Sequence, residues 1–220
     1  MKYFIAGVVL IAAVLIATAL TYPYLPSRVP MHWDAHGNVN GWGAKWTLFA
    51  INPGIMAGLL LLWAALPWLS PKHFEVDTFR STYLYIMVVM LAMLAYIHGL
   101  ILAASLSWKV DVSRAMVGGI CLLIALLGNV LGKVRRNFYV GIRTPWTIAN
   151  EQVWNATHRL AAKTFFAGGV AGLLAVILRA PFWAPMTLIL AAGLAPAVYS
   201  LVFYKQLEGR GGVNGKEAGA

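Results

Sequence analysis

The residue types best suited to binding or catalysis gather in one stretch, RRNFYVGIRTPWTIANEQVWNATHR, at residues 135–159. Its arginines can bind phosphates or carboxylates through paired N–H donors. A helix that begins at Pro145 would add the free backbone N–H groups of its first turn, which favour an anion. Arg143, together with Arg135 or Arg136, could therefore hold a phosphate or a carboxylate at this helix start.

Two alternative helix starts are predicted within this stretch. Thr144 can cap a helix whose first residue is Pro145. Alternatively, Asn150 can cap a helix that begins at Glu151 and continues into an apolar segment. Residues three or four positions apart on that helix share a face. One face carries Glu151, Trp154 and His158, and another carries Gln152, Asn155 and Arg159.

The chemistry of this stretch leaves three interpretations open. It could be an anchor whose tryptophans and arginines lie among lipid headgroups. It could be the anion site described above. It could also be a docking surface for another protein.

A second group of polar side chains follows the first apolar segment. Five of them alternate along the chain and would share one face of an extended strand, namely His32, Asp34, His36, Asn38 and Asn40. Imidazole and carboxylate groups in this arrangement could bind Zn²⁺, which makes His32, Asp34 and His36 weak candidates for metal ligands. Nearby glycines argue against a continuous strand, so we expect no high-affinity metal site. The alternative is a loop held at headgroup level by Trp33, Trp42 and Trp46.

The composition predicts the surroundings of these two groups of polar residues. Hydrophobic residues make up 60% of the chain and charged residues 11%, and the mean hydropathy is +0.73. Soluble domains carry about 25% charged residues, so this chain is expected to be an integral membrane protein. Its net charge of +10 is then explained by anionic lipid rather than by direct contact with nucleic acid.

Six apolar segments are long enough to cross a bilayer, which needs about 20 residues. They predict an all-α protein with six transmembrane helices, at residues 4–22, 47–69, 82–106, 114–132, 161–178 and 184–204. The fifth segment is short, so we expect its helix to begin earlier, near Asn150. His98 lies inside the third segment, and an ionisable residue there is a functional candidate. Because no Asp or Glu lies in any predicted span, a neutral imidazole hydrogen-bonded between helices is the favoured interpretation.

The distribution of Lys and Arg predicts the orientation. Twelve of the 17 lie at the termini and in the second and fourth connections, and five lie in the other connections. Cytoplasmic loops are the richer in Lys and Arg, so both termini are expected in the cytoplasm. The chain then divides into a first helical hairpin with an extracellular His- and Trp-containing loop (1–69), a four-helix remainder with a cytoplasmic signature segment at 133–163 (70–204), and a disordered Gly-rich tail (205–220).

Residues 128–163, GNVLGKVRRNFYVGIRTPWTIANEQVWNATHRLAAK, resemble the signature of the SdpI family of bacterial membrane proteins. The resemblance rests on Asn137, on Gly141 through Thr147, on Trp154, and on Thr157 through Arg159. The extracellular loop adds a second match, through Pro30, His32, Trp33, Gly37 and Lys45.

The resemblance implies a multi-pass protein of the bacterial cytoplasmic membrane that gives immunity to a secreted killing peptide. It also implies a signalling receptor that holds a transcriptional repressor at the membrane, and it implies neither an enzyme nor a cofactor. The alternative is a small transporter or a protein that binds anionic lipid. The candidate residues for a cytoplasmic partner or an anion are Arg135, Arg136, Asn137, Gly141, Arg143, Thr144, Pro145, Trp146, Glu151, Trp154, Thr157, His158 and Arg159.

Overall fold

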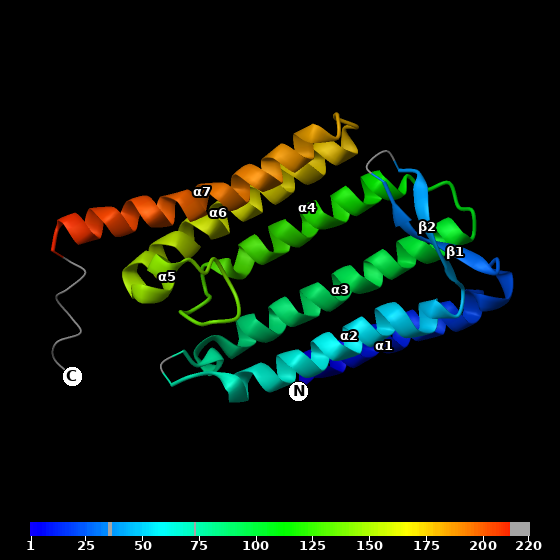
Figure 1. The fold of residues 1–220 in the computed structure, drawn as a ribbon, viewed down its shortest axis with the longest axis horizontal. Helices are drawn as coiled ribbons and strands as arrows, with labels where there is room; N and C mark the ends of the chain where they lie inside the picture. The colour runs from blue at the N-terminus through cyan, green and yellow to red at the C-terminus, as the bar shows by residue number, and fades with distance from the viewer. Residues whose placement is uncertain (35–36, 73, 212–220) are drawn as a thin grey trace.

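The computed structural model describes residues 1–34, 37–72 and 74–211. Within this part of the chain, six helices are long and apolar enough to cross a membrane, which confirms the predicted all-α, multi-span fold. The long helices and the short elements between them follow one another along the chain (Figure 1): α1 (Lys2–Thr21), β1 (Arg28–Trp33), β2 (Val39–Ala44), α2 (Thr47–Ala65), α3 (Arg80–Ser105), α4 (Val112–Leu131), α5 (Pro145–Ala149), α6 (Glu151–Ile177) and α7 (Trp183–Gly209). Single 3₁₀ turns lie at Tyr22–Tyr24, Leu66–Leu69 and Val76–Phe79.

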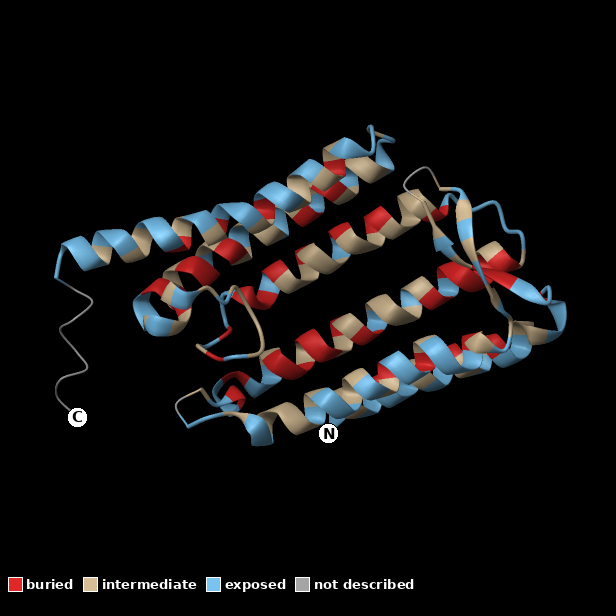
Figure 2. Ribbon diagram, viewed as in Figure 1, coloured by how far each residue is buried: buried red, intermediate tan, exposed pale blue. Residues whose placement is uncertain are grey.

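The polar regions lie at opposite ends of the helical bundle. The two-stranded sheet of β1 and β2 lies at one end, and α5 with the loop that precedes it lies at the other (Figure 1). The helices divide into two groups, with α1, α2 and α3 packed together and α4, α6 and α7 packed together. Helices α3 and α4 form the joint between the groups, and much of the burial in Figure 2 falls on these two helices. The outer faces of α1, α2 and α7 are exposed apolar surface, as a bilayer requires.

Glycines allow α4 and α6 to approach at backbone distance. A Cβ atom on Gly128 of α4 would lie 2.4 Å from the backbone nitrogen of Phe166. A Cβ atom on Gly169 of α6 would lie 2.5 Å from the backbone nitrogen of Ala125. Small residues at helix crossings are the usual means of association within a bilayer, so the glycines of the fifth span serve close packing.

The proline within α7 has a compensating partner on α6. Pro196 has no N–H group to donate to the carbonyl of Ala192 one turn earlier. The hydroxyl of Thr164 on α6 donates to that carbonyl at 2.9 Å. The hydrogen bond that α7 lacks is thus replaced from a neighbouring helix, and α7 continues without a break to Gly209.

His98 on α3 is buried and bonded to another helix, which agrees with the favoured interpretation. Its Nε2 atom lies 2.8 Å from the Thr18 hydroxyl on α1. That hydroxyl donates its own proton to the carbonyl of Val14 at 2.8 Å, so it accepts from Nε2–H. This hydrogen bond joins α1 to α3.

One expectation about the ends of helices is confirmed, and one needs revision. The start of α6 at Glu151 confirms the early beginning predicted for the fifth span. Residues Lys205–Gly209, which were expected to be disordered, continue α7 because Pro196 does not end the helix. Residues 212–220 of the predicted tail lie outside the described residues.

The loop after α1 forms a hairpin rather than one alternating strand. The chain reverses after Asp34, where Gly37 has a φ of +87° and its N–H donates to the Asp34 carbonyl at 3.0 Å. His32 and Asn40 therefore lie on facing strands. Val29 of β1 is fully buried and packs with Leu48 and Ile101, and this apolar contact holds the hairpin on the bundle.

Candidate functional site

The signature segment, residues 133–163, begins as a loop that Asn137 holds together. The Asn137 side chain is fully buried. Its amide nitrogen donates to the carbonyls of Arg135 and Val140, at 2.7 and 3.0 Å. Its oxygen accepts from the backbone N–H groups of Tyr139 and Val140, both at 2.7 Å. One amide thus replaces the backbone pairing that an irregular buried loop would otherwise lack.

Gly141 and His158 join this loop to α6. The His158 Nδ1–H donates to the Trp154 carbonyl at 2.9 Å, since a carbonyl can only accept. Nε2 is then free to accept the backbone N–H of Ile142, at 3.0 Å. Gly141 has a φ of +114°, and a Cβ atom there would lie 2.3 Å from Nε2. Only glycine lets the loop pass this close to the imidazole.

Trp154 fixes the position of α6 against the end of α4. The indole is fully buried and stacks on His158, with ring centroids 4.1 Å apart. Its Nε1–H donates to the carbonyl of Val134 at 2.8 Å. Trp154 also belongs to the core cluster that includes Tyr83 and Met87 of α3, so the segment is anchored to both groups of helices.

The two helix starts that the sequence offered as alternatives are both present. Thr144 caps α5, and its side chain and that of Thr147 each accept the other's backbone N–H. Asn150 caps α6, accepting from the N–H groups of Gln152 and Val153 at 2.8 and 3.1 Å. The Trp146 indole donates to the Ser200 hydroxyl and so ties α5 to α7. Ser200 carried no sequence signal beyond being polar within an apolar span.

The charged residues of the segment lie at the surface, at two separate places. An Arg143 guanidinium N–H donates to the Phe138 carbonyl, and the side chain is otherwise exposed. Arg135 and Arg136 line a separate pocket of about 360 Å³, the mixed-charge pocket, with Glu75, Thr78 and Glu151. The structure therefore brings Arg135, Arg136 and Glu151 together and places Arg143 outside that pocket's lining.

The mixed-charge pocket is also lined by residues outside the signature segment, which the sequence gave no reason to group with it. Glu75 and Thr78 come from the connection between α2 and α3. The Arg136 guanidinium lies over the Phe74 ring, 5.1 Å from its centroid, and donates to the Ile148 carbonyl at 3.2 Å. A cation–π contact and a carbonyl hold Arg136 in position, while Arg135 stays exposed.

The remaining signature residues differ in exposure. Thr157 is fully buried and its hydroxyl has no hydrogen-bond partner in the described residues. Pro145 and Arg159 are exposed. Arg159 lies with Lys163 and Tyr199 along a shallow apolar surface between α6 and α7.

At the opposite end of the molecule, the hairpin residues are engaged with one another. His32 Nδ1 is hydrogen-bonded to the Asn40 side-chain oxygen. The Lys45 ammonium donates to the Tyr22 and Leu25 carbonyls, both at 3.3 Å, and lies over the Tyr22 ring. Pro30 is buried, and Trp33 and Gly37 are half-buried. His36 lies outside the described residues, and among those described no group of three His, Cys, Asp or Glu could hold a metal ion.

Six apolar helices with an ordered hairpin at one end and an internally bonded polar segment at the other define a multi-pass helical membrane protein. Residues 133–204 match the SdpI/YfhL protein family. Residues 9–57, which contain most of α1 and the hairpin, match a domain of unknown function, DUF1648. The chain is 23% identical to Immunity protein SdpI of Bacillus subtilis (strain 168) over 221 residues, which cover 95% of this chain and 99% of that protein. No solved structure matches the chain.

The chain is thus similar to the SdpI/YfhL protein family over residues 133–204 and to Immunity protein SdpI along nearly its whole length. The family match falls on the segment whose polar residues hold α4, α5, α6 and α7 together. The six apolar helices and this similarity identify the chain as a multi-pass protein of the bacterial cytoplasmic membrane.

Proposed function

We propose that this protein gives a bacterium immunity to a secreted killing peptide. The observation that carries the proposal is the likeness to Immunity protein SdpI along nearly the whole of both chains. A likeness of that extent includes the hairpin, the six helices and the signature segment together. The test is whether the chain protects peptide-sensitive cells.

The proposal assigns different tasks to the two ends of the molecule. The hairpin end faces the outside, where it meets the killing peptide, and both termini lie in the cytoplasm. The signature segment then faces the cytoplasm, where it holds a repressor. Support comes from the excess of Lys and Arg at that end and from exposed Arg135, Arg143 and Arg159 on a segment made rigid by internal hydrogen bonds. The proposed action is binding, with no catalytic step and no cofactor.

The orientation predicts which cysteines an impermeant thiol reagent will label in intact cells. In a Cys121→Ser background, a cysteine at Asn38 in the hairpin turn should be labelled. A cysteine at Gln152 should be labelled only after the membrane is permeabilised. Gln152 is exposed and its side chain has no hydrogen bond to any described residue, whereas Asn150 caps α6 and must be kept. Labelling of Gln152→Cys alone in intact cells would reverse the orientation.

Replacing Arg143 should weaken the proposed cytoplasmic interaction. Arg143 keeps guanidinium donors free beyond its bond to Phe138. Loss of a charge-assisted hydrogen-bonding group costs about 1.5–3 kcal/mol, which is about 10- to 150-fold in a binding constant. We expect Arg143→Ala to reduce capture of a repressor by this factor, and Arg143→Lys to recover only part of it, because an ammonium lacks the planar fork.

The matched control for this prediction is Arg210→Ala, which removes an exposed arginine just beyond α7. Capture is measured at equal amounts of membrane protein. Hydrogen exchange across 133–163 separates lost binding from a disordered segment. Wild-type capture by Arg143→Ala would show that the segment is an interfacial anchor at this position.

A further inference from the structure

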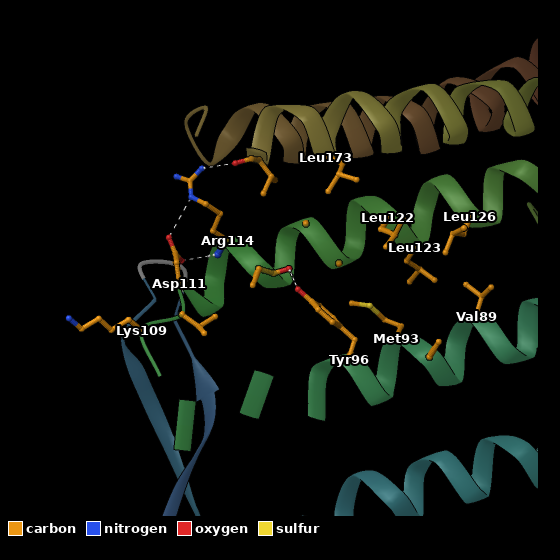
Figure 3. Close-up of a pocket in the computed structure, with 16 residues that line it drawn as sticks. Val89, Met93, Tyr96, Lys109, Asp111, Arg114, Leu122, Leu123, Leu126 and Leu173 are labelled. Carbon is orange, nitrogen blue, oxygen red and sulfur yellow. Dashed lines mark hydrogen bonds and ion pairs between the residues drawn. The ribbon is translucent and has the colours of Figure 1, made fainter. Parts of the chain in front are cut away.

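A groove between α3 and α4 takes no part in the proposed immunity. Its volume is about 620 Å³, and it follows the joint between the two groups of helices (Figure 3). Its walls are apolar, with Val89 and Met93 from α3, Leu122 and Leu126 from α4, and Leu173 from α6. Within the bilayer such a groove can only hold something apolar.

One end of the groove is charged. Lys109, Asp111 and Arg114 line that end, next to the hairpin, and the Lys109 side chain extends outward from it (Figure 3). Arg114 is held in place, since its Nε lies 3.5 Å from an Asp111 carboxylate oxygen and an Nη donates to the Val176 carbonyl at 3.3 Å. Lys109 is exposed and has no hydrogen bond or ion pair to any described residue. The rim therefore carries two cations against one carboxylate, with an ammonium free to bind an anion.

Tyr96 lies between the charged rim and the apolar walls. Its hydroxyl donates to the Ala115 carbonyl of α4 at 2.8 Å, across the groove (Figure 3). The ring has room there because Gly119 has no side chain, and a Cβ atom at that position would lie 2.5 Å from the ring. The groove thus continues past a polar hydroxyl near the rim into a purely apolar channel.

The length of the groove matches one leaflet of a membrane. Arg114 and Leu126 are twelve residues apart on α4, which corresponds to about 18 Å at the rise of an α-helix. Half of the hydrocarbon core is about 15 Å. A chain lying in the groove would extend from the headgroup level to the centre of the bilayer.

We propose that the groove binds one acyl chain of an anionic phospholipid, with its phosphate at Lys109 and Arg114. The apolar walls fit the chain, the free ammonium fits the phosphate, and the length fits one leaflet. A lipid in this position fills the joint between α1–α3 and α4–α7 and stabilises it. This goes beyond immunity and is tested without any killing peptide.

The experiment measures thermal unfolding of the purified full-length protein in detergent as phospholipid is added. Phosphatidylglycerol should raise the unfolding midpoint in a saturable manner, and phosphatidylcholine with the same acyl chains should raise it less. Native mass spectrometry should show one phosphatidylglycerol retained at the lowest concentrations. Equal shifts from both lipids, or no saturable binding, would overturn the proposal.

Two pairs of variants locate the site. Ala92→Trp places an indole in the groove from an exposed position, so it should abolish the lipid-dependent shift, whereas Ala12→Trp on the lipid-facing side of α1 should not. Lys109→Glu should weaken phosphatidylglycerol binding about tenfold, whereas Lys72→Glu at the opposite end should leave it unchanged. Undiminished binding by both Ala92→Trp and Lys109→Glu would place the lipid elsewhere. Displacement of the lipid by a hydrophobic peptide, with no preference for the anionic headgroup, would assign the groove to a peptide and contradict the proposal.

Discussion

Gly169→Val is expected to separate α6 from α4 and to remove most of the correctly folded protein. A Cβ atom at Gly169 would lie 2.5 Å from the Ala125 backbone nitrogen and 2.6 Å from the Cys121 carbonyl oxygen. Backbone atoms cannot rotate away as a side chain can, so the helices must move apart. Overpacking of a well-packed core lowers the free energy of unfolding by up to about 3 kcal/mol. Moving the helices apart also removes the close contacts at the neighbouring Gly128.

The control for this prediction is Gly193→Val on α7. A Cβ atom at Gly193 would meet no atom of the described residues within 4 Å, while the change in helix propensity is the same at both positions. The measurement is the fraction of monodisperse protein after detergent extraction, together with the unfolding midpoint. If Gly169→Val and Gly193→Val gave equal monodisperse fractions, the close approach of α4 and α6 would be wrong.

Gly141→Ala is expected to disrupt the signature segment while the six long helices remain. The new methyl group would lie 2.3 Å from His158 Nε2, so the imidazole must leave the Ile142 N–H to which it is bonded. A φ of +114° is also unfavourable for alanine, and a strained residue of this kind costs about 1–3 kcal/mol. Hydrogen exchange should quicken across 133–163, and repressor capture should be lost.

Gly211→Ala is the control for an alanine at a positive φ outside the signature segment. Gly211 has a φ of +70°, but a Cβ atom there meets no described residue within 4 Å. This variant carries a backbone penalty without the clash and should behave as wild type in both measurements. Slow exchange in Gly141→Ala, equal to that of wild type, would mean that the loop does not pass against His158.

The sequence allowed the helices and their starts to be predicted because the signals for them are local. Apolar runs of sufficient length mark the spans, and Thr144 and Asn150 are side chains that cap whatever helix follows them. The hairpin was missed because its strands are short and depend on a distant contact, the burial of Val29 against Leu48 and Ile101. No local pattern reports such a contact.

The sequence allowed candidate residues for the site to be named, but it did not show how they are arranged. Trp154 and His158 do share one face of α6 with Glu151, as the spacing required. That face passes from the surface at Glu151 to the interior at Trp154 and His158. An indole or an imidazole suits either setting, so periodicity could not tell which side was inward. The mixed-charge pocket depends on Glu75 and Thr78, whose place beside Arg136 is set by how α3 packs.

Protection of living cells tests the central claim most directly. Bacillus subtilis cells that lack Immunity protein SdpI would carry an empty vector or would express this chain or SdpI itself, at equal membrane amounts. They would then be grown together with cells that secrete the killing peptide. The proposed immunity predicts growth with the wild-type chain and with SdpI, and death with the empty vector. Death of cells that hold the folded wild-type chain in their membrane, while SdpI protects, would contradict it.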